Sequence, residues 1–396
     1  MKSILILNPY VSTLGGGEKA MGYFCRSLEE YFHDDVHIDI LVFNTYGVDV
    51  FAKDYIEIKD LNKRFSIRLK HTYLKKIDLP ISTNWKETVK NKYLIEQISR
   101  GYDLFVNFMF LSKHIGHAKK NLYHCFFPPK RYGAELRGRG RVLGMLYDLM
   151  FFLKYDLYIS NSQYTNHWLA QFWKLKRRNR VIYPPVFSEQ EMEGRYIESK
   201  KKNMILSVGR FFVGTHSKKQ LDMVQFFIEY ADRLSGYEYH LVGSVSERKD
   251  DLAYLEQVEA LARKAGNVSV HVNCKSDTLM ELYQQAKIFW HATGYGIDEN
   301  KEPEKMEHFG ITTVEAMSFG AVPVVINKGG QKETVEEGIN GFRWDTKQEC
   351  VEKTCRLIQD DRLRKKMAQE SVKRAGYYSI EEFDRQNKEV LHGLKV

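Results

Sequence analysis

Short apolar runs alternate with longer amphipathic stretches along the first half of the chain. Residues 3–8 (SILILN) form a compact apolar run, which is typical of a strand buried on both faces. The pattern predicts further strands at 37–43, 103–108, 122–125, 156–160 and 181–183, and helices at 18–32, 85–98, 141–153 and 162–174. Strands that alternate with helices indicate βαβ units around a mainly parallel sheet.

The alternation stops at residues 183–203 and then begins again. Pro184 and Pro185 interrupt strands and helices because each lacks a backbone N–H, and residues 188–203 are polar with no apolar period. The pattern then predicts strands at 204–208, 239–242, 268–272, 288–291 and 322–326. It predicts helices between the strands 239–242, 268–272 and 288–291, and at 219–234, 311–319, 348–360, 362–375 and 380–394. We therefore predict an α/β protein with two doubly wound Rossmann-like domains, 1–190 and 191–375, and a C-terminal segment, 376–396, with ligands in a cleft between the domains.

Composition excludes several classes of protein. No apolar stretch reaches the ~18 residues of a membrane-spanning helix, and the start MKSILILNPY has no small-residue cleavage site of a secretory signal. The five cysteines form no CxxC pair and no Cys/His cluster with zinc-ligand spacing. We expect a cytoplasmic protein with free thiols and no metal site.

The positive charge is concentrated in the first half. Residues 1–200 contain 31 basic and 21 acidic side chains, whereas the remainder contains 29 and 30. The excess lies in 101–180, with 14 basic and 4 acidic residues. Such a region attracts anionic surfaces such as acidic lipid, nucleic acid or a phosphorylated substrate, although a solvated basic face with no partner has the same composition.

The segment EHFGITTVE at 307–315 carries the most chemical information. Glu307 and Glu315 are eight residues apart, with a glycine turn and a helix start between them. The free N–H groups of Gly310, Ile311 and Thr312 would stabilise a phosphate at this helix start. Carboxylates accept hydrogen bonds from vicinal hydroxyls, so the pattern suits a ligand with a sugar, a diphosphate and a ribose in a row. The alternative is an acidic helix N-terminus that only interacts with the helix dipole.

Two glycine-containing segments follow predicted strands. VGRFF at 208–212 precedes HSKK at 216–219, and Arg210 and Lys218 could both reach a diphosphate from the strand end. The glycines at 15–17 follow the first strand and allow backbone N–H groups to approach a ligand, but they form neither GxGxxG nor a Walker loop. A basic loop and a plain tight turn are the alternatives.

Taken in order, these segments resemble the large retaining GT-B glycosyltransferase family, which includes bacterial lipopolysaccharide mannosyltransferases and eukaryotic dolichol-linked mannosyltransferases. The matching segments are GGGEK at 15–19, ISNSQYT at 159–165, YPP at 183–185, VGRFF and HSKK, and EHFGITTVEAMSFGAVPVV at 307–325. The resemblance implies a GT-B fold, with an N-terminal acceptor domain, a C-terminal nucleotide-sugar domain and a final helix that crosses back onto the first domain.

The resemblance also implies a role for each matching residue. Glu315 would hold the ribose hydroxyls, and Glu307 would contact the transferred sugar. Arg210 and Lys218 would bind the diphosphate, with Lys219 as a neighbour that could replace Lys218. The remaining donor contacts would come from Gly16, Gly17, Phe309, Gly310, Ile311, Thr312 and, near the base, Asn273.

The first domain departs from the family at one position. Relatives with a CHxPP segment carry a histidine in the cleft, and Phe126 stands there in this chain. His124 and His117 are the candidates to replace it. The alternative for each is a structural histidine near a strand end.

The implied activity is that of a metal-independent retaining hexosyltransferase with no cofactor beyond its donor. The donor would be a nucleoside diphosphate sugar, GDP-mannose first and a UDP-hexose second, and the acceptor a glycan or lipid-linked glycan. One alternative is a nucleotide-sugar epimerase of the same fold. The other is a basic nucleic-acid-binding or scaffold protein, but the chain lacks an aromatic-interleaved basic motif, so we expect no nucleic-acid partner.

A basic cluster precedes an apolar run in the first domain. Arg131, Arg137, Arg139 and Arg141 lead into residues 142–153, a run too short to span a bilayer. The run could lie on an anionic membrane, which would place the protein at the inner face of that membrane. The alternative, which we favour here, is an ordinary core helix with a basic rim.

Overall fold

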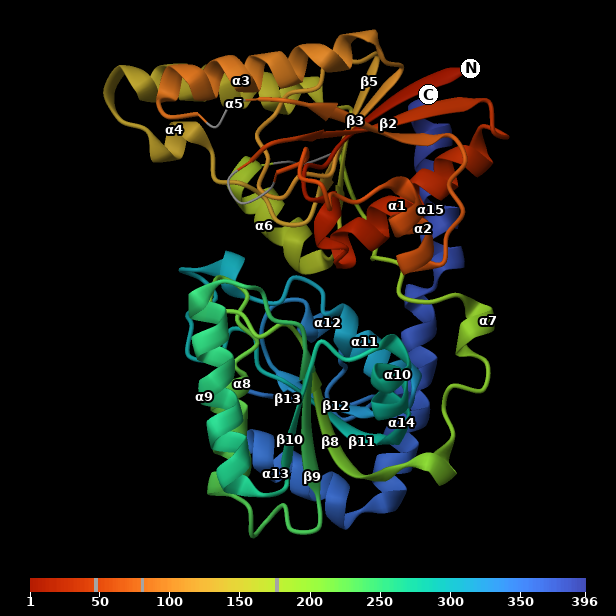
Figure 1. Ribbon diagram of the computed structural model, residues 1–396, viewed down its shortest axis with the longest axis vertical. Coiled ribbons are helices and arrows are strands. Elements are labelled where there is room, and N and C mark those ends of the chain that lie inside the picture. The colour runs from red at the N-terminus through yellow and green to blue at the C-terminus, as the bar shows by residue number, and fades with distance from the viewer. Residues whose placement is uncertain (46–48, 80–81, 175–177) are drawn as a thin grey trace. The chain divides into compact units, whose positions relative to one another are not determined.

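The computed structural model describes residues 1–45, 49–79, 82–174 and 178–396. It forms two compact units, which we call unit 1 (Met1–Pro185 with Ile380–Val396) and unit 2 (Val186–Ser379). The chain leaves unit 1 at the proline pair and returns to it for the last helix. Each unit is a parallel sheet with helices on both faces, which confirms the predicted doubly wound α/β fold (Figure 1).

The described residues of unit 1 form a seven-stranded parallel sheet in the order β3-β2-β1-β4-β5-β6-β7. The strands are β1 Lys2–Leu7, β2 Val36–Phe43, β3 Thr72–Ile77, β4 Leu104–Asn107, β5 Lys120–Cys125, β6 Leu157–Ser160 and β7 Asn179–Val181. The helices are α1 Gly16–Tyr31, α2 Ile58–Phe65, α3 Trp85–Ile98, α4 Tyr132–Glu135, α5 Gly138–Lys154, α6 Gln163–Trp173 and α15 Ile380–Leu394. Alternate residues of β1 face opposite sides of the sheet, so Ile4 and Leu5 belong to different core clusters.

The final helix α15 packs against α1 on one face of the unit 1 sheet (Figure 1). Phe383 and Leu391 of α15 are buried in the same cluster as Phe24 of α1. Lys388 forms an ion pair with Glu30 at 2.8 Å on the rim of this contact. Burial of the apolar stripe of α15 thus fixes the C-terminus on unit 1.

Unit 2, all of which is described, contains a six-stranded parallel sheet in the order β10-β9-β8-β11-β12-β13. The strands are β8 Lys202–Val208, β9 Glu238–Gly243, β10 Val268–Val272, β11 Ala286–His291, β12 Val322–Ile326 and β13 Phe342–Trp344. The helices are α7 Glu189–Met192, α8 Gln220–Glu229, α9 Lys249–Ala265, α10 Ser276–Gln285, α11 Ile311–Ser318, α12 Gln331–Thr334, α13 Lys347–Gln359 and α14 Asp361–Ala375. The strand order reverses between β8 and β11, and such a reversal is where doubly wound sheets bind ligands.

The apolar pattern did not predict every element of the structure. It missed α2 and the edge strand β3, which lie in 44–84, the strand β13, and the four-residue helices α4, α7 and α12. In β3, Tyr73 and the lysines 75 and 76 are exposed or half-exposed, because an edge strand buries little surface. Its apolar period is therefore too weak to stand out.

Candidate functional site

The carboxylate of Glu307 lies at the centre of a polar cluster in unit 2. It accepts a hydrogen bond from Lys218 Nζ, with which it forms an ion pair, and another from His291 Nε2 at 3.1 Å. Lys218 follows β8, His291 ends β11, and Glu307 precedes α11. The cluster therefore joins the carboxyl ends of the two strands at which the strand order reverses.

The cluster holds a charged carboxylate in a poorly hydrated place. Burial disfavours ionisation of Glu307, whose side chain is 18% exposed, but Lys218 and His291 outweigh burial and hold its pKa well below the usual range. Burial lowers the pKa of His291 although Glu307 opposes this effect. At neutral pH the cluster thus consists of a carboxylate, an ammonium and a neutral imidazole.

Glycines hold the loop that carries Glu307. Gly310 begins α11 with φ of 97°, a conformation that side-chain-bearing residues rarely adopt. The N–H of Gly330 donates to the carbonyl oxygen of Glu307 at 2.7 Å. A Cβ on Gly330 would lie 2.3 Å from the carbonyl oxygen of His308. The loop therefore approaches residues 329–330 more closely than any residue with a side chain would allow.

We expect Gly330→Ala to destabilise the protein by about 2 kcal/mol or more, because the methyl group has no space beside the loop. Thermal unfolding of the purified variant measures this loss. Gly376→Ala is the matched control, since a Cβ there meets nothing within 4 Å and φ is not positive. Equal melting temperatures for the two variants would contradict the expectation.

Glu315 belongs to a separate contact on the same helix. Its Oε2 accepts a hydrogen bond from the hydroxyl of Tyr283 at 2.9 Å, and the ring of Tyr283 stacks on Phe319. Tyr283 is fully buried, whereas Glu315 is half-buried. The tyrosine occupies one carboxylate oxygen and fixes the side chain, which leaves other acceptor positions of the carboxylate for a ligand.

The other predicted donor residues of unit 2 lie just after its strands or at the starts of its helices. Arg210 is exposed with its guanidinium over the Phe212 ring, and Lys219 caps α8 with φ of 59°. Asn273 follows β10 and accepts from the N–H of Val245 at 3.3 Å. The remaining predicted residues lie along the loop and the first turn of α11: Phe309, which is buried against Tyr378, Gly310, Ile311 and Thr312.

Three histidines near Glu307 were not found by sequence reasoning. His291 contacts the carboxylate directly, and His216 packs edge-to-face against His308 with ring centroids 4.9 Å apart. Burial lowers the pKa of both, to about 3 for His308, so they are neutral at pH 7. A sequence feature could have identified His291, because the predicted strand 288–291 ends in this histidine. The carboxyl ends of parallel strands lie at the edge of the sheet where ligands bind.

In unit 1 the glycine loop starts α1. Gly16 is its first residue, and a Cβ on Gly17 would lie 3.4 Å from the Phe126 ring. Glu18 closes the turn by accepting from Gly15 N at 3.0 Å and from Thr13 Oγ1 at 2.7 Å. The turn thus presents glycine backbone at the carboxyl end of β1.

The two candidate histidines of unit 1 have structural surroundings. His124 is 1% exposed and stacks on Phe108 at 4.3 Å, and burial lowers its pKa to about 3. His117 lies just before the amino end of β5, where its N–H donates to Ser99 Oγ at 2.8 Å. Ligands of parallel sheets bind at the carboxyl ends, so His117 lies at the wrong edge and His124 lies inside the core.

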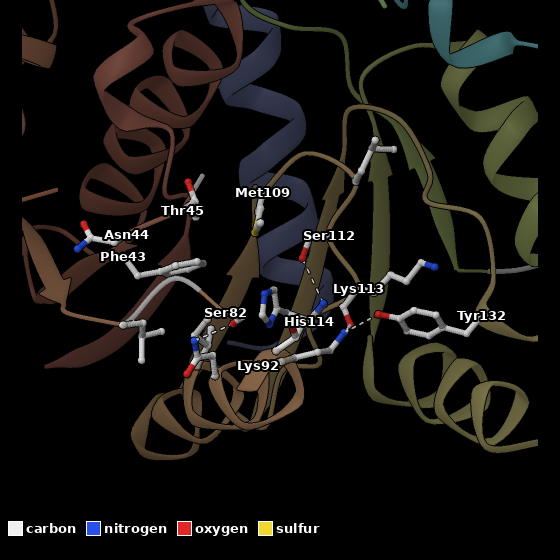
Figure 2. Close-up of a pocket in the computed structure, with 15 residues that line it drawn as sticks. Phe43, Asn44, Thr45, Ser82, Lys92, Met109, Ser112, Lys113, His114 and Tyr132 are labelled. Carbon is white, nitrogen blue, oxygen red and sulfur yellow. Dashed lines mark hydrogen bonds between the residues drawn. The ribbon is translucent and has the colours of Figure 1, made fainter. Parts of the chain in front are cut away.

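A cavity of about 480 Å³ lies at the carboxyl ends of β2, β3 and β4 in unit 1 (Figure 2). The inner face of α3 forms one wall. Its lining combines aromatic, amide, hydroxyl and cationic groups, as small-molecule sites do. The lining includes Phe43, Asn44, Asn91, Lys92, Lys113 and Tyr132.

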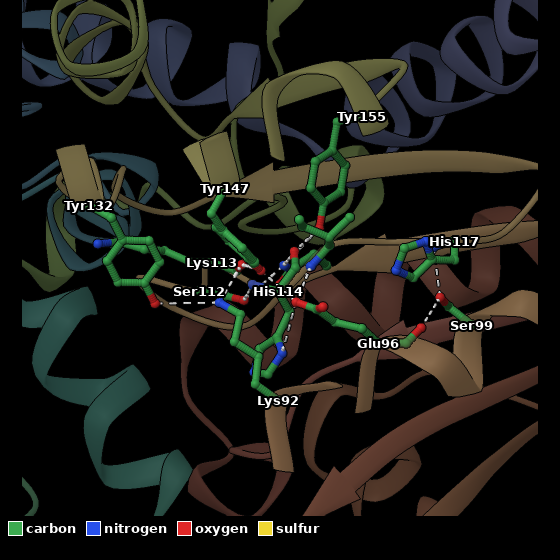
Figure 3. Close-up of polar contacts among 12 residues, drawn as sticks. Lys92, Glu96, Ser99, Ser112, Lys113, His114, His117, Tyr132, Tyr147 and Tyr155 are labelled. Carbon is green, nitrogen blue, oxygen red and sulfur yellow. Dashed lines mark hydrogen bonds and ion pairs between the residues drawn. The ribbon is translucent and has the colours of Figure 1, made fainter. Parts of the chain in front are cut away.

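Lys92 is held in this wall by a network that joins α3 to α5 (Figure 3). Its Nζ donates to the carbonyl oxygen of Lys113 at 2.7 Å and lies 4.3 Å from the centre of the Tyr147 ring. Tyr147 in turn donates to Glu96 Oε1 at 2.6 Å. Burial lowers the pKa of Lys92 to about 8 and raises that of Glu96.

The lowered pKa of Lys92 has a measurable effect on stability. Between about pH 8 and its ordinary value of 10.5, the unfolded chain holds this proton more tightly than the folded chain. Stability therefore rises with pH in this window, by at most ~1.4 kcal/mol per pH unit. We expect urea unfolding to show this rise in the wild type relative to Lys92→Met. Parallel pH profiles for the two proteins would contradict it.

The chain is similar to known glycosyltransferases in sequence. The family model "Glycosyl transferases group 1" matches residues 188–374, nearly all of unit 2. A mouse GDP-Man:Man(3)GlcNAc(2)-PP-Dol alpha-1,2-mannosyltransferase is 22% identical over 96% of this chain and 85% of its own length. The alpha-1,3/1,6-mannosyltransferase ALG2 of Candida glabrata is 25% identical over 81% and 75%. A Dictyostelium discoideum alpha-1,2-mannosyltransferase is 28% identical over 50% of this chain, which spans 39% of that relative.

Solved structures share the fold over the whole chain. Anabaena HepE in complex with UDP and glucose has a TM-score of 0.68 at 16% identity and covers 99% of this chain and 100% of its own. Sucrose-phosphate synthase from Thermosynechococcus elongatus has a TM-score of 0.68 at 14% identity and covers 100% and 99%. The chain therefore has the GT-B fold, and residues 188–374 of its second unit match the glycosyl transferases group 1 family.

Proposed function

We propose that the protein transfers a hexose, with retention of anomeric configuration, from a nucleoside diphosphate sugar to a glycan or lipid-linked glycan. GDP-mannose is our first choice of donor and a UDP-hexose our second. The similarity to relatives named as GDP-Man alpha-1,2-mannosyltransferases supports this order. The observation that carries the proposal is the Glu307–Lys218–His291 cluster at the start of α11. It combines a cation, an anion and helix-start N–H groups at one end of the sheet.

In the proposed reaction the donor diphosphate binds Arg210, Lys218 and the N–H groups that begin α11. The bond from the sugar C1 to the diphosphate oxygen breaks, and the acceptor hydroxyl oxygen bonds to C1 on the same face. The departing phosphate oxygen takes the hydroxyl proton. Positive charge and helix-start amides stabilise the developing negative charge, so the proposal needs no metal.

Glu307 orients the transferred sugar through its hydroxyls, and Glu315 binds the ribose hydroxyls. The glycine backbone at 16–17 would face the donor phosphates. The backbone near Asn273 would face the base of the donor. The acceptor binds in the unit 1 cavity, whose amide, hydroxyl and aromatic lining suits a saccharide. The reaction takes place in the cytoplasm.

The test is a panel of nucleotide sugars with chelator present, assayed for hydrolysis without acceptor and for transfer to lipid-linked glycans. We expect turnover with GDP-mannose and an α-linked product by NMR. An inverted product would contradict retention, and turnover only with added divalent cation would contradict metal independence. Release of nucleotide with an epimerised sugar would instead support the epimerase. The match of residues 188–374 to the glycosyl transferases group 1 model argues against the nucleic-acid-binding alternative.

A further inference from the structure

Helix α5 exposes its apolar side chains and buries a polar one, which is the opposite of a helix in a protein core. The residues that it buries are Gly144, Asp148 and Phe151. Its exposed side chains are mostly large and apolar: Val142, Leu143, Met145, Leu146, Leu149, Met150 and Leu153, each at least half exposed. The core-helix interpretation of this run is therefore wrong.

The buried polar residue of α5 explains why the helix lies this way. Asp148 accepts hydrogen bonds from the N–H groups of Tyr132 at 3.0 Å and Gly133 at 2.8 Å, which start α4. Gly144 lets Tyr132 approach, since a Cβ there would lie 2.8 Å from that side chain. These contacts hold the polar side of α5 inward, so its apolar stripe faces outward.

Helix α3 repeats the pattern beside it. Trp85, Val89 and Tyr93 recur every four residues, hence on one side of the helix, and are 72%, 57% and 58% exposed. Lys92 and Glu96 follow Val89 and Tyr93 by three residues each and so lie on an adjoining side of α3. Lys92 lines the cavity, and Glu96 accepts the hydrogen bond from Tyr147 of α5. We call the exposed apolar residues of α3 and α5 the α3–α5 face.

Basic residues surround the α3–α5 face. Lys86, Lys90, Arg137, Arg139, Arg141 and Lys154 are all exposed. None of them forms an ion pair with a residue that the structure describes. Apolar side chains with a free basic rim match the chemistry of an anionic bilayer surface, whereas a protein partner would not need this excess of one charge. No helix within the described ranges is long and apolar enough to cross a bilayer.

We propose that the α3–α5 face binds the surface of an anionic lipid bilayer, with the apolar side chains inserted among the acyl chains and the basic rim at the headgroups. The proposal goes beyond the transfer reaction, because it identifies where the protein works. Since the same helix α3 lines the cavity and carries part of the α3–α5 face, the cavity lies beside the lipid surface. A lipid-linked acceptor then reaches the cavity without leaving its membrane.

Vesicle flotation tests the proposal with the full chain. We expect the wild type to float with vesicles that contain phosphatidylglycerol and to remain below with phosphatidylcholine alone or at high salt. Leu143→Glu with Leu146→Glu should weaken binding by tenfold or more. Arg137→Gln, Arg139→Gln and Arg141→Gln together should weaken it by about a hundredfold, since each cation contributes about fivefold.

Controls separate this proposal from other occupants and from misfolding. Leu252→Glu with Met280→Glu changes two apolar residues of unit 2 that are 40% and 41% exposed, and should leave binding unchanged. A second measurement needs no charged variant: brominated lipid should quench a fluorescence component present in the wild type and absent in Trp85→Phe.

Three results would overturn the proposal. One is no flotation with anionic vesicles at low salt, and another is equal flotation of the wild type and the α3–α5 variants. The third is a wild-type dimer that Leu143→Glu with Leu146→Glu converts to a monomer, without vesicle binding, which would make the face a contact between copies. Hydrolysis of the soluble donor does not depend on this face. An absence of hydrolysis would therefore count against the proposed reaction and not against membrane binding.

Discussion

We expect Glu307→Ala and Lys218→Ala each to lower kcat by about 100-fold or more, with a much smaller change in donor affinity. In the free protein the two side chains neutralise each other. When the donor binds, the ammonium can turn to the diphosphate and the carboxylate to the sugar hydroxyls. Both contacts strengthen as the C1–oxygen bond breaks, so their loss affects the transition state more than the bound donor.

Steady-state kinetics with a fixed acceptor measure this effect. Glu302→Ala is the control, because this glutamate lies five residues away and pairs with Lys305 at the surface. We expect it to retain full activity. Near-wild-type turnover of Glu307→Ala or Lys218→Ala would remove that residue from the mechanism.

Lys219→Ala distinguishes the neighbouring lysines. Lys218, not Lys219, contacts Glu307, so Lys218→Ala should have the larger effect. A larger loss for Lys219→Ala would show that the sequence alternative, in which Lys219 binds the diphosphate, is right.

The second large effect is expected at Glu315, where Glu315→Gln should raise the donor KM by tenfold or more and change kcat little. A charged acceptor for two ribose hydroxyls becomes an amide with one acceptor oxygen, and hydrogen bonds to charged groups contribute about 1.5–3 kcal/mol each. Because the ribose is remote from the breaking bond, the loss is shared by ground and transition states.

Donor analogues sharpen this test. A 2′-deoxy donor should bind weakly to the wild type and no more weakly to Glu315→Gln, since both changes remove the same contact. Tyr283→Phe is the matched variant, because it removes only the hydroxyl that holds the carboxylate. If the 2′-deoxy donor and Glu315→Gln lower the donor affinity additively, the ribose does not contact Glu315.

Much of the fold could be predicted from local patterns. Buried parallel strands such as β1 and β12 are continuous apolar runs, and the proline pair marks where the chain leaves unit 1. The edge strand β3 was missed because it buries only one side, so its sequence carries little apolar signal. The final helix was visible as a helix, but its place against α1 depends on a contact with residues at the other end of the chain.

The candidate site was predictable only in part. Glu307, Glu315, Arg210 and Lys218 stood in segments whose glycines and helix starts indicate ligand binding, and the structure brings Lys218 onto Glu307. His291 was missed because nothing in a strand sequence shows which neighbour its last side chain meets. His124 was a candidate that the structure places in a stack with Phe108, inside the core.

By itself the sequence determined most of the strands and helices, the break between the units and the residue types of the candidate site, because these depend on local period and spacing. Only the tertiary structure decided which lysine meets Glu307, which histidine joins them and which side of α5 faces out. An apolar stripe is the same in sequence whether it faces a core or solvent. The polar contacts of Asp148 with α4, which form only in the folded chain, turn the stripe of α5 outward.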